Sequence, residues 1–133
     1  MLKKFVSDDL LFEYQAKIIR TLKDTESCVI VGKAADYVLR DCPNVLSVYI
    51  EAPREYTRRR NMEIQSVPPD IAANMITRTD KYRADYYAQY TNGNYWTNTV
   101  NYDITLNSAR LGIDGCVNII KQCLKEKLGV ELP

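Results

Sequence analysis

Short runs of apolar residues alternate along this chain with longer segments that have a helical pattern. The first run, residues 28–31, is rich in β-branched residues and ends at Gly32, and further runs cover 45–50 and 102–107. An unbroken apolar run is typical of a strand buried on both faces, as in a parallel sheet. Strands separated by helices require right-handed crossovers, so the sequence predicts an α/β layer fold.

Helical patterns fill the segments between these runs. Residues 7–25 are predicted to form an amphipathic helix with Ser7 or Asp8 as its N-cap. Its apolar residues at helical spacing fall on one face, at Leu11, Tyr14, Ile18 and Leu22. A second helix is predicted over 34–40, because Pro43 disfavours its continuation.

The second half of the chain has the same alternation. Pro53 suits the first turn of a helix that runs to about Glu63, and the next helix begins near Asp70. Residues 108–112 are predicted to be a loop, and a last helix runs from Ile113 to Gly129. The residues expected to face inward on that helix are Val117, Ile120 and Leu124.

The densest group of charged and aromatic residues lies within residues 75–96. At helical spacing Asp80, Arg83 and Tyr87 share one face, and a neighbouring face carries Tyr82, Tyr86 and Tyr90. A helix stop is predicted at 91–94, since Asn and Gly tolerate the left-handed conformation. Just upstream stand Arg54, Arg58, Arg59 and Arg60. Because the guanidinium fork matches phosphate oxygens, this cluster suits a multiply charged anion.

Each of these features also has a plainer interpretation. Charged residues at helical spacing are most often a solvated face, and tyrosines four residues apart mostly pack on one another. Lys33, at the end of the first apolar run, suits a phosphate contact, although a surface lysine in a turn has the same pattern. Ligands in open α/β sheets bind beyond the carboxyl ends of the strands. The predicted strands that end at Gly32 and at Glu51 have these ends at the same edge of the sheet.

Composition limits the class of protein. With 133 residues, the chain is predicted to be one domain spanning residues 1–133. Its net charge of +1 indicates neither nucleic acid nor a membrane as partner, so any anion site is local. No apolar run approaches the roughly 20 residues of a membrane span. The N-terminus also lacks the pattern of a secretory signal.

Cysteine and histidine usage excludes several kinds of site. The sequence has four cysteines without a CxxC pair and no histidine, which makes a structural zinc site improbable. Nucleophile pairs of Ser or Cys with His are excluded as well. Buried free thiols in a reducing cytoplasm are the favoured interpretation of Cys28, Cys42, Cys116 and Cys123.

Several segments together resemble the cytidylate kinase-like family, a branch of the P-loop nucleoside monophosphate kinases. In chain order they read VIVGKAADYVL, NVLSVYIEAPREYTRRR, TDKYRADYYAQYT, NYWTNTVNYDITLNS and LGIDGCVNII. The resemblance runs from Cys28 to about Lys121, and its most specific part is the D-K-x-R-x-x-Y-Y element that begins at Asp80. It implies a three-layer P-loop-kinase-like parallel sheet with flanking helices and a helical lid. It also implies transfer of the γ-phosphoryl group of ATP, with Mg²⁺, to a nucleoside monophosphate such as CMP.

The resemblance further implies roles for individual residues. Arg60, Arg78 and Arg83 match the catalytic arginines of the lid and of an Asp-x-x-Arg pair, with residues 54–91 as the lid-like helical region. Arg58 and Arg59 are alternative matches to the family position assigned to Arg60. The substrate-binding positions are Lys33, Asp80 and Lys81, and no metal-binding residue is implied. Arginines on a closing lid supply alignment and charge neutralisation, which is what phosphoryl transfer requires.

One departure from the family pattern is large. None of the five glycines belongs to a GxxxxGK[ST] loop, and the strand that precedes it in the family is also missing. Without this central strand, two strand edges would lack partners, which favours a homodimer. The sequence is therefore a piece of a longer protein, a shortened relative or a degraded copy, and we expect little or no kinase activity from the chain alone.

Two other classes of function stay open. The chain could be a non-catalytic module that binds a nucleotide or anion without turnover. It could also bind single-stranded nucleic acid, since arginines alternate with aromatic residues that stack on bases. The near-neutral net charge disfavours the second class, so no nucleic acid partner is expected.

Overall fold

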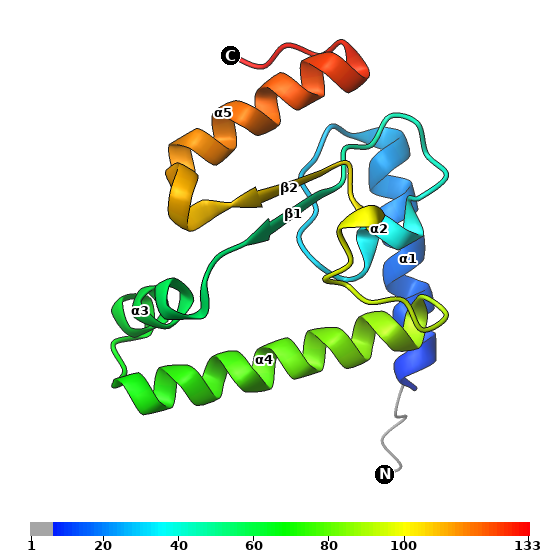
Figure 1. The fold of residues 1–133 in the computed structure, drawn as a ribbon. Coiled ribbons are helices and arrows are strands. Elements are labelled where there is room, and N and C mark those ends of the chain that lie inside the picture. The colour runs from blue at the N-terminus through cyan, green and yellow to red at the C-terminus, as the bar shows by residue number, and fades with distance from the viewer. Residues whose placement is uncertain (1–6) are drawn as a thin grey trace.

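Two parallel strands form the sheet of this protein, for which a computed structural model describes residues 7–133. β1 (Val48–Glu51) pairs with β2 (Ile104–Asn107), and Val48 stands opposite Ile104. The helices are α1 (Asp8–Thr25), α2 (Ala35–Val38), α3 (Arg54–Gln65), α4 (Pro69–Tyr90) and α5 (Ser108–Leu128), with a 3₁₀ turn η1 (Thr99–Asn101). Figure 1 shows α5 along one side of the sheet and α3 and α4 on the other. No helix of residues 7–133 is long and apolar enough to cross a membrane.

The strand predicted over 28–31 is wrong. This segment is irregular, and Val29 and Val31 are 92% and 85% exposed. Its backbone forms no hydrogen bond with another backbone group of residues 7–133. A strand exists only when a neighbour pairs with it, and here no described strand lies beside it. The architecture is therefore mixed α/β with a two-stranded parallel sheet, and the described residues do not build a three-layer sheet.

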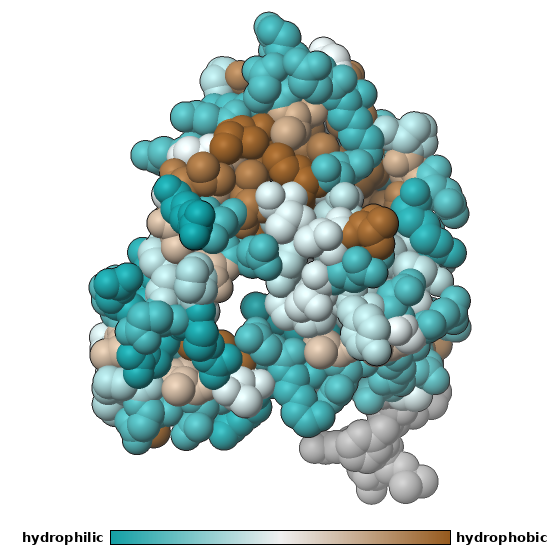
Figure 2. All heavy atoms as spheres, viewed as in Figure 1, coloured by the Kyte–Doolittle hydropathy of each residue, from teal (hydrophilic) through white to brown (hydrophobic). Residues whose placement is uncertain are grey.

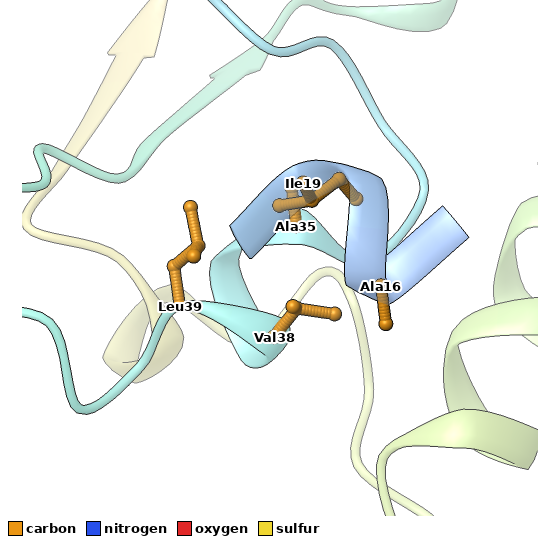
Figure 3. Packing of buried hydrophobic residues seen from close by; sticks show 5 residues of the cluster. All are labelled: Ala16, Ile19, Ala35, Val38 and Leu39. Atoms are coloured by element: carbon orange, nitrogen blue, oxygen red, sulfur yellow. The ribbon is translucent and has the colours of Figure 1, made fainter. Parts of the chain in front are cut away.

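A small core joins α1 to α2. Its buried residues are Ala16, Ile19, Ala35, Val38 and Leu39, which Figure 3 shows on α1 and on α2 with its C-terminal end. Ser7 is the N-cap of α1, since its hydroxyl accepts from the Leu10 backbone N–H. The helix faces the core with a different stripe from the one predicted: Leu11, Tyr14 and Ile18 are 48%, 54% and 59% exposed. α1 carries two apolar stripes, and helical spacing alone does not tell which of them a partner covers.

α3 and α4 form the predicted helical region of residues 54–91. α3 starts at the expected proline, with Pro53 as its N-cap, and α4 begins at Pro69, one residue before the predicted start near Asp70. α4 ends as predicted, because Asn92 and Gly93 have left-handed φ angles of 57° and 81°. Thr91 at this end is fully buried, and its hydroxyl donates to the Tyr87 carbonyl at 2.5 Å.

α5 begins five residues before its predicted start at Ile113, so the predicted loop at 108–112 is wrong. The Asn107 side chain caps the helix by accepting from the backbone N–H groups of Ala109 and Arg110. Gly112 interrupts the helix with φ 71° and ψ 168°. Downstream of this kink Cys116 is buried, whereas Val117, predicted to face inward, is 42% exposed.

The cysteines differ in burial. Cys116 is buried and Cys28 is exposed, while Cys42 and Cys123 are intermediate. All four are free thiols, as expected from their spacing. The prediction that they are buried is confirmed only for Cys116. Cys28 is exposed because its segment is not part of a sheet.

Candidate functional site

The site is built where β1 ends and α3 begins, opposite the middle of α4. Arg54 is the first residue of α3 and directly follows the two-residue linker after Glu51. Asp80 and Arg83 lie three residues apart on α4, so they project from the same side of the helix. α5 packs on the sheet, while Figure 2 shows a hollow between the strands and α4. The side chains of this region therefore face open space.

Asp80 lies between two guanidinium groups. Its Oδ2 is 3.9 Å from Arg54 Nη1, and its Oδ1 is 3.8 Å from Arg83 Nη1. Both distances are longer than those of a charge-assisted hydrogen bond, about 2.7–2.9 Å. The three side chains are each about half exposed, at 51%, 46% and 59% for Arg54, Asp80 and Arg83. The carboxylate thus holds two cations close together without consuming their hydrogen-bonding capacity.

Arg54 is the better fixed of the two arginines. Its Nη2 donates to the Thr77 hydroxyl at 2.5 Å and to the Ala73 carbonyl at 3.0 Å. Both acceptors are on α4, so this side chain links the start of α3 to the helix that carries Asp80. Sequence reasoning counted Arg54 among the arginines of the predicted anion cluster but gave it no role of its own. The available signal was its position, because it is the first arginine after the carboxyl end of a strand.

Aromatic rings border this charged group. The Trp96 ring centroid lies 6.0 Å from the guanidinium carbon of Arg83 and 5.4 Å from the Tyr49 ring, in edge-to-face geometry. Tyr49 in turn stacks on Tyr102 at 5.2 Å. Burial raises the pKa of Tyr49, and the carboxylates of Glu51 and Asp80 raise it further. The Tyr49 phenol therefore stays neutral beside the charged side chains.

The predicted residues are brought together only in part. Asp80 and Arg83 form the pair expected from their spacing. Lys81 is exposed and instead pairs with Asp85 at 2.8 Å, and this hydrogen bond raises the pKa of Lys81. Arg78 is exposed and belongs to none of the ion pairs within residues 7–133.

Arg60 and Lys33 lie in other surroundings. Arg60 lines a mostly apolar groove between β1, α3 and α5, with Ile50, Tyr56, Ser108, Ile113, Cys116, Val117 and Ile120. Figure 2 shows the hydrophobic side chains that gather along α5 near this groove. Lys33 is exposed in a turn before α2, with a left-handed φ of 60°. Three residues later, Asp36 accepts a hydrogen bond from Tyr87 on α4.

The acidic side chains near the arginines are poorly placed for a metal ion. Among residues 7–133 no three His, Cys, Asp or Glu side chains gather closely enough to hold a metal. Asp80 is flanked by two arginines, which compete with a cation for its oxygens. The residues described here therefore do not fit a protein-only Mg²⁺ site.

Comparison with known proteins agrees with the motifs. No curated protein sequence matches the chain. One similar solved structure is the crystal structure of an uncharacterized protein from Eubacterium ventriosum ATCC 27560. It superposes with a TM-score of 0.83 and 29% sequence identity, over 90% of this chain and 74% of that chain. The sequence profile of the cytidylate kinase-like family matches residues 1–110. The chain therefore belongs to the cytidylate kinase-like family.

Proposed function

We propose that this chain binds a nucleoside monophosphate such as CMP and serves the phosphotransferase reaction of a cytidylate kinase-like protein. The observation that carries the proposal is the Arg54–Asp80–Arg83 group at the carboxyl end of β1. Ligands of open α/β sheets bind at this end of the strands. Family membership makes a nucleotide the natural anion for the two arginines.

The charges of the group suit a phosphate. Two guanidinium groups held near one carboxylate leave a net positive charge and several N–H donors unused. A phosphate presents oxygens that accept such forked donors, and each charge-assisted bond is stronger than a neutral one. Phosphoryl transfer needs alignment and charge neutralisation from the protein, which arginines supply.

Asp80 has a separate role in this proposal. Without a ligand, it reduces the repulsion between the two guanidinium groups, which would otherwise move apart. With a nucleotide bound, its half-exposed carboxylate can accept from a ribose hydroxyl. Asp80 is therefore proposed as a positioning residue for both arginines and for the sugar.

The remaining residues implied by the family resemblance lie outside the Arg54–Asp80–Arg83 group. Lys33, Arg60, Arg78 and Lys81 are not bonded to Asp80 or Arg83 in this structure. Closure of α3 and α4 as a lid would bring arginines toward the substrate and exclude water. Their catalytic and substrate-binding roles stay predictions.

ATP is the second substrate in the family reaction. The sequence contains no GxxxxGK[ST] loop, which is the element that cradles ATP phosphates in P-loop enzymes. We therefore propose that the chain alone binds the nucleotide but transfers little or no phosphate. Measurable ADP formation from ATP and CMP by the purified chain would overturn this second part.

The first part is tested by calorimetric titration with CMP in the absence of ATP. We expect saturable binding that Arg83→Ala and Arg54→Ala each weaken at least tenfold, because a charged hydrogen bond to phosphate is worth about 1.5–3 kcal/mol. Arg20→Ala is the matched control, since Arg20 is an exposed arginine on α1. Equal loss in all three variants would indicate nonspecific attraction, and no binding by the folded wild type would refute the proposal.

A second candidate is a nucleotide-binding module that never turns over. The same missing phosphate loop favours it. The two candidates differ when a protein or segment that supplies a phosphate loop is added. A phosphotransferase should then form ADP from ATP and CMP, whereas a binding module should bind CMP with unchanged affinity and form none.

A further inference from the structure

We infer that the indole of Trp96 is a stacking platform for the base of the nucleotide whose phosphate Arg54 and Arg83 bind. The inference rests on the proposed function and adds the part of the ligand that the arginines do not explain. It assigns the site to nucleotides as a class, in preference to sugar phosphates or inorganic phosphate.

Trp96 is held in place from two sides. The Tyr102 hydroxyl donates to the Trp96 backbone carbonyl at 2.5 Å, and the Tyr49 ring contacts the indole at 5.4 Å between centroids. Tyr49 and Tyr102 stack on each other, so the two supports form one unit. Tyr49 belongs to β1, where it pairs with Thr105 of β2. A ring fixed in this way loses little conformational freedom when a ligand binds.

The indole also keeps an accessible surface beside the cations. Trp96 is only partly buried, and the guanidinium carbon of Arg83 lies 6.0 Å from its centroid. This distance is at the outer limit of a cation–π interaction. Direct contact between stacked groups occurs at about 3.5–4.0 Å, so Arg83 does not cover the ring closely. A phosphate drawn to Arg83 would bring the attached nucleoside next to the indole.

This arrangement predicts a particular kind of specificity. Stacking of a base on an aromatic side chain strengthens binding by about 5- to 150-fold per base. It tolerates differences among bases, because every base has a π face. The site should therefore prefer CMP strongly over ribose 5-phosphate and should distinguish CMP, UMP and AMP by only about tenfold or less.

The chain offers a direct optical readout, since Trp96 is its single tryptophan. We would titrate the protein with CMP and with ribose 5-phosphate and follow both indole fluorescence and calorimetric heat. The inference expects CMP to bind at least fivefold tighter than ribose 5-phosphate and to change the fluorescence. Ribose 5-phosphate should bind with little fluorescence change.

Variants complete the test. Trp96→Ala should reduce CMP affinity to that of ribose 5-phosphate, and Trp96→Phe should restore most of the difference. Tyr95→Ala is the matched control, because Tyr95 is the adjacent aromatic residue and is 73% exposed. Circular dichroism of each variant checks that the fold survives the loss of the contact with Tyr49.

The outcomes separate this inference from the proposal beneath it. If CMP binds in an Arg83-dependent manner but Trp96→Ala leaves its affinity unchanged, the stacking inference is wrong and the proposed function stands. Equal affinities for CMP and ribose 5-phosphate would refute it in the same way. If neither ligand binds to the folded chain, both fail.

Discussion

The phenol of Tyr87 on α4 donates a 2.7 Å hydrogen bond to the Asp36 carboxylate on α2, across 51 positions of sequence. Tyr87 is 5% exposed, and burial raises its pKa, as does this hydrogen bond. Burial also raises the pKa of Asp36, while the bond from Tyr87 acts to lower it. A four-residue helix such as α2 is not stable by itself, so the small core holds α2 on α1 and this bond ties it to α4.

Tyr87→Phe tests the importance of this bond for stability. The variant leaves the Asp36 carboxylate partly buried without its donor, which should lower the free energy of unfolding by about 1–3 kcal/mol. Urea denaturation at pH 7 measures the change. Tyr82→Phe is the control, because Tyr82 is 66% exposed and its hydroxyl is not bonded to a described residue. Equal effects of the two substitutions would contradict the prediction.

The pH dependence of the Tyr87→Phe variant has a definite sign. A carboxyl whose folded pKa lies above its unfolded value of about 3.9 binds protons more readily in the native state. Its contribution to stability therefore falls as the pH rises from the unfolded pKa through the folded pKa. Removing the Tyr87 donor takes away an interaction that lowers the pKa of Asp36. The cost of Tyr87→Phe should therefore be larger at pH 7 than at pH 4. If the loss of stability did not depend on pH, it would not arise from the Asp36 carboxylate.

Asp103 should have the opposite dependence. Burial acts to raise its pKa, but hydrogen bonds from Lys127 at 2.8 Å and from the Ser47 backbone at 2.8 Å outweigh burial and hold the pKa below its usual value. A carboxylate of this kind stabilises the fold above the unfolded pKa of about 3.9, and that stability is lost as pH falls through the folded pKa.

Asp103→Asn should therefore lower stability at pH 7 by about 1 kcal/mol, a value discounted because the Asp103 side chain is 34% exposed. The difference from wild type should vanish near pH 2, where both side chains are neutral. Thermal unfolding at several pH values measures this. Asp85→Asn is the control, since its pair with Lys81 is two-thirds exposed and should contribute almost nothing.

Much of the fold and part of the site could be predicted from local sequence. The bounds of α1, the start of α3 after Pro53, the start of α4 near Asp70, and the stop at Asn92 and Gly93 all depend on neighbouring residues. The conformation of residues 28–31 could not be predicted in this way, because a strand needs a pairing partner, and local sequence does not show whether that partner is present. The predicted homodimer, in which a second copy would supply that partner, stays a prediction.

The site also has a part that local sequence predicts and a part that depends on tertiary packing. The pair of Asp80 and Arg83 follows from helical spacing and was predicted. The part played by Arg54 depends on how α3 packs on α4, which brings it to Thr77 across 23 positions of sequence. Arg60 points into the groove beside α5 for the same reason. Residue type and spacing thus predicted the cluster of arginines around Asp80, and tertiary packing decided which of them lie beside it.

The two isoleucines of α1 test which stripe of this helix faces the core. Ile19 is 5% exposed and Ile18 is 59% exposed, although they are adjacent. Ile19→Ala should lower the free energy of unfolding by about 2 kcal/mol or more, through lost burial and the cavity that remains. Ile18→Ala should change it by less than about 0.5 kcal/mol. Urea denaturation of both variants would show a reversed order if the sequence-predicted face were the buried one.

Two glycines of α5 differ in backbone conformation. Gly112 has a left-handed φ of 71° at the kink, whereas Gly115 lies in regular helix. A Cβ at either position meets open space or ordinary contact, the nearest atom being Leu111 Cβ at 3.5 Å from a Cβ at 115. The effect of adding a Cβ therefore differs between the two positions only through the backbone conformation.

Gly112→Ala should destabilise the protein by about 1–2 kcal/mol, because a residue with a Cβ is strained in the left-handed region. Gly115→Ala should stabilise it by about 0.5–1 kcal/mol, since alanine loses less backbone entropy in a helix. Thermal unfolding of the two variants side by side measures the difference in sign. Two stabilising substitutions would mean that α5 runs straight through Gly112 without a kink.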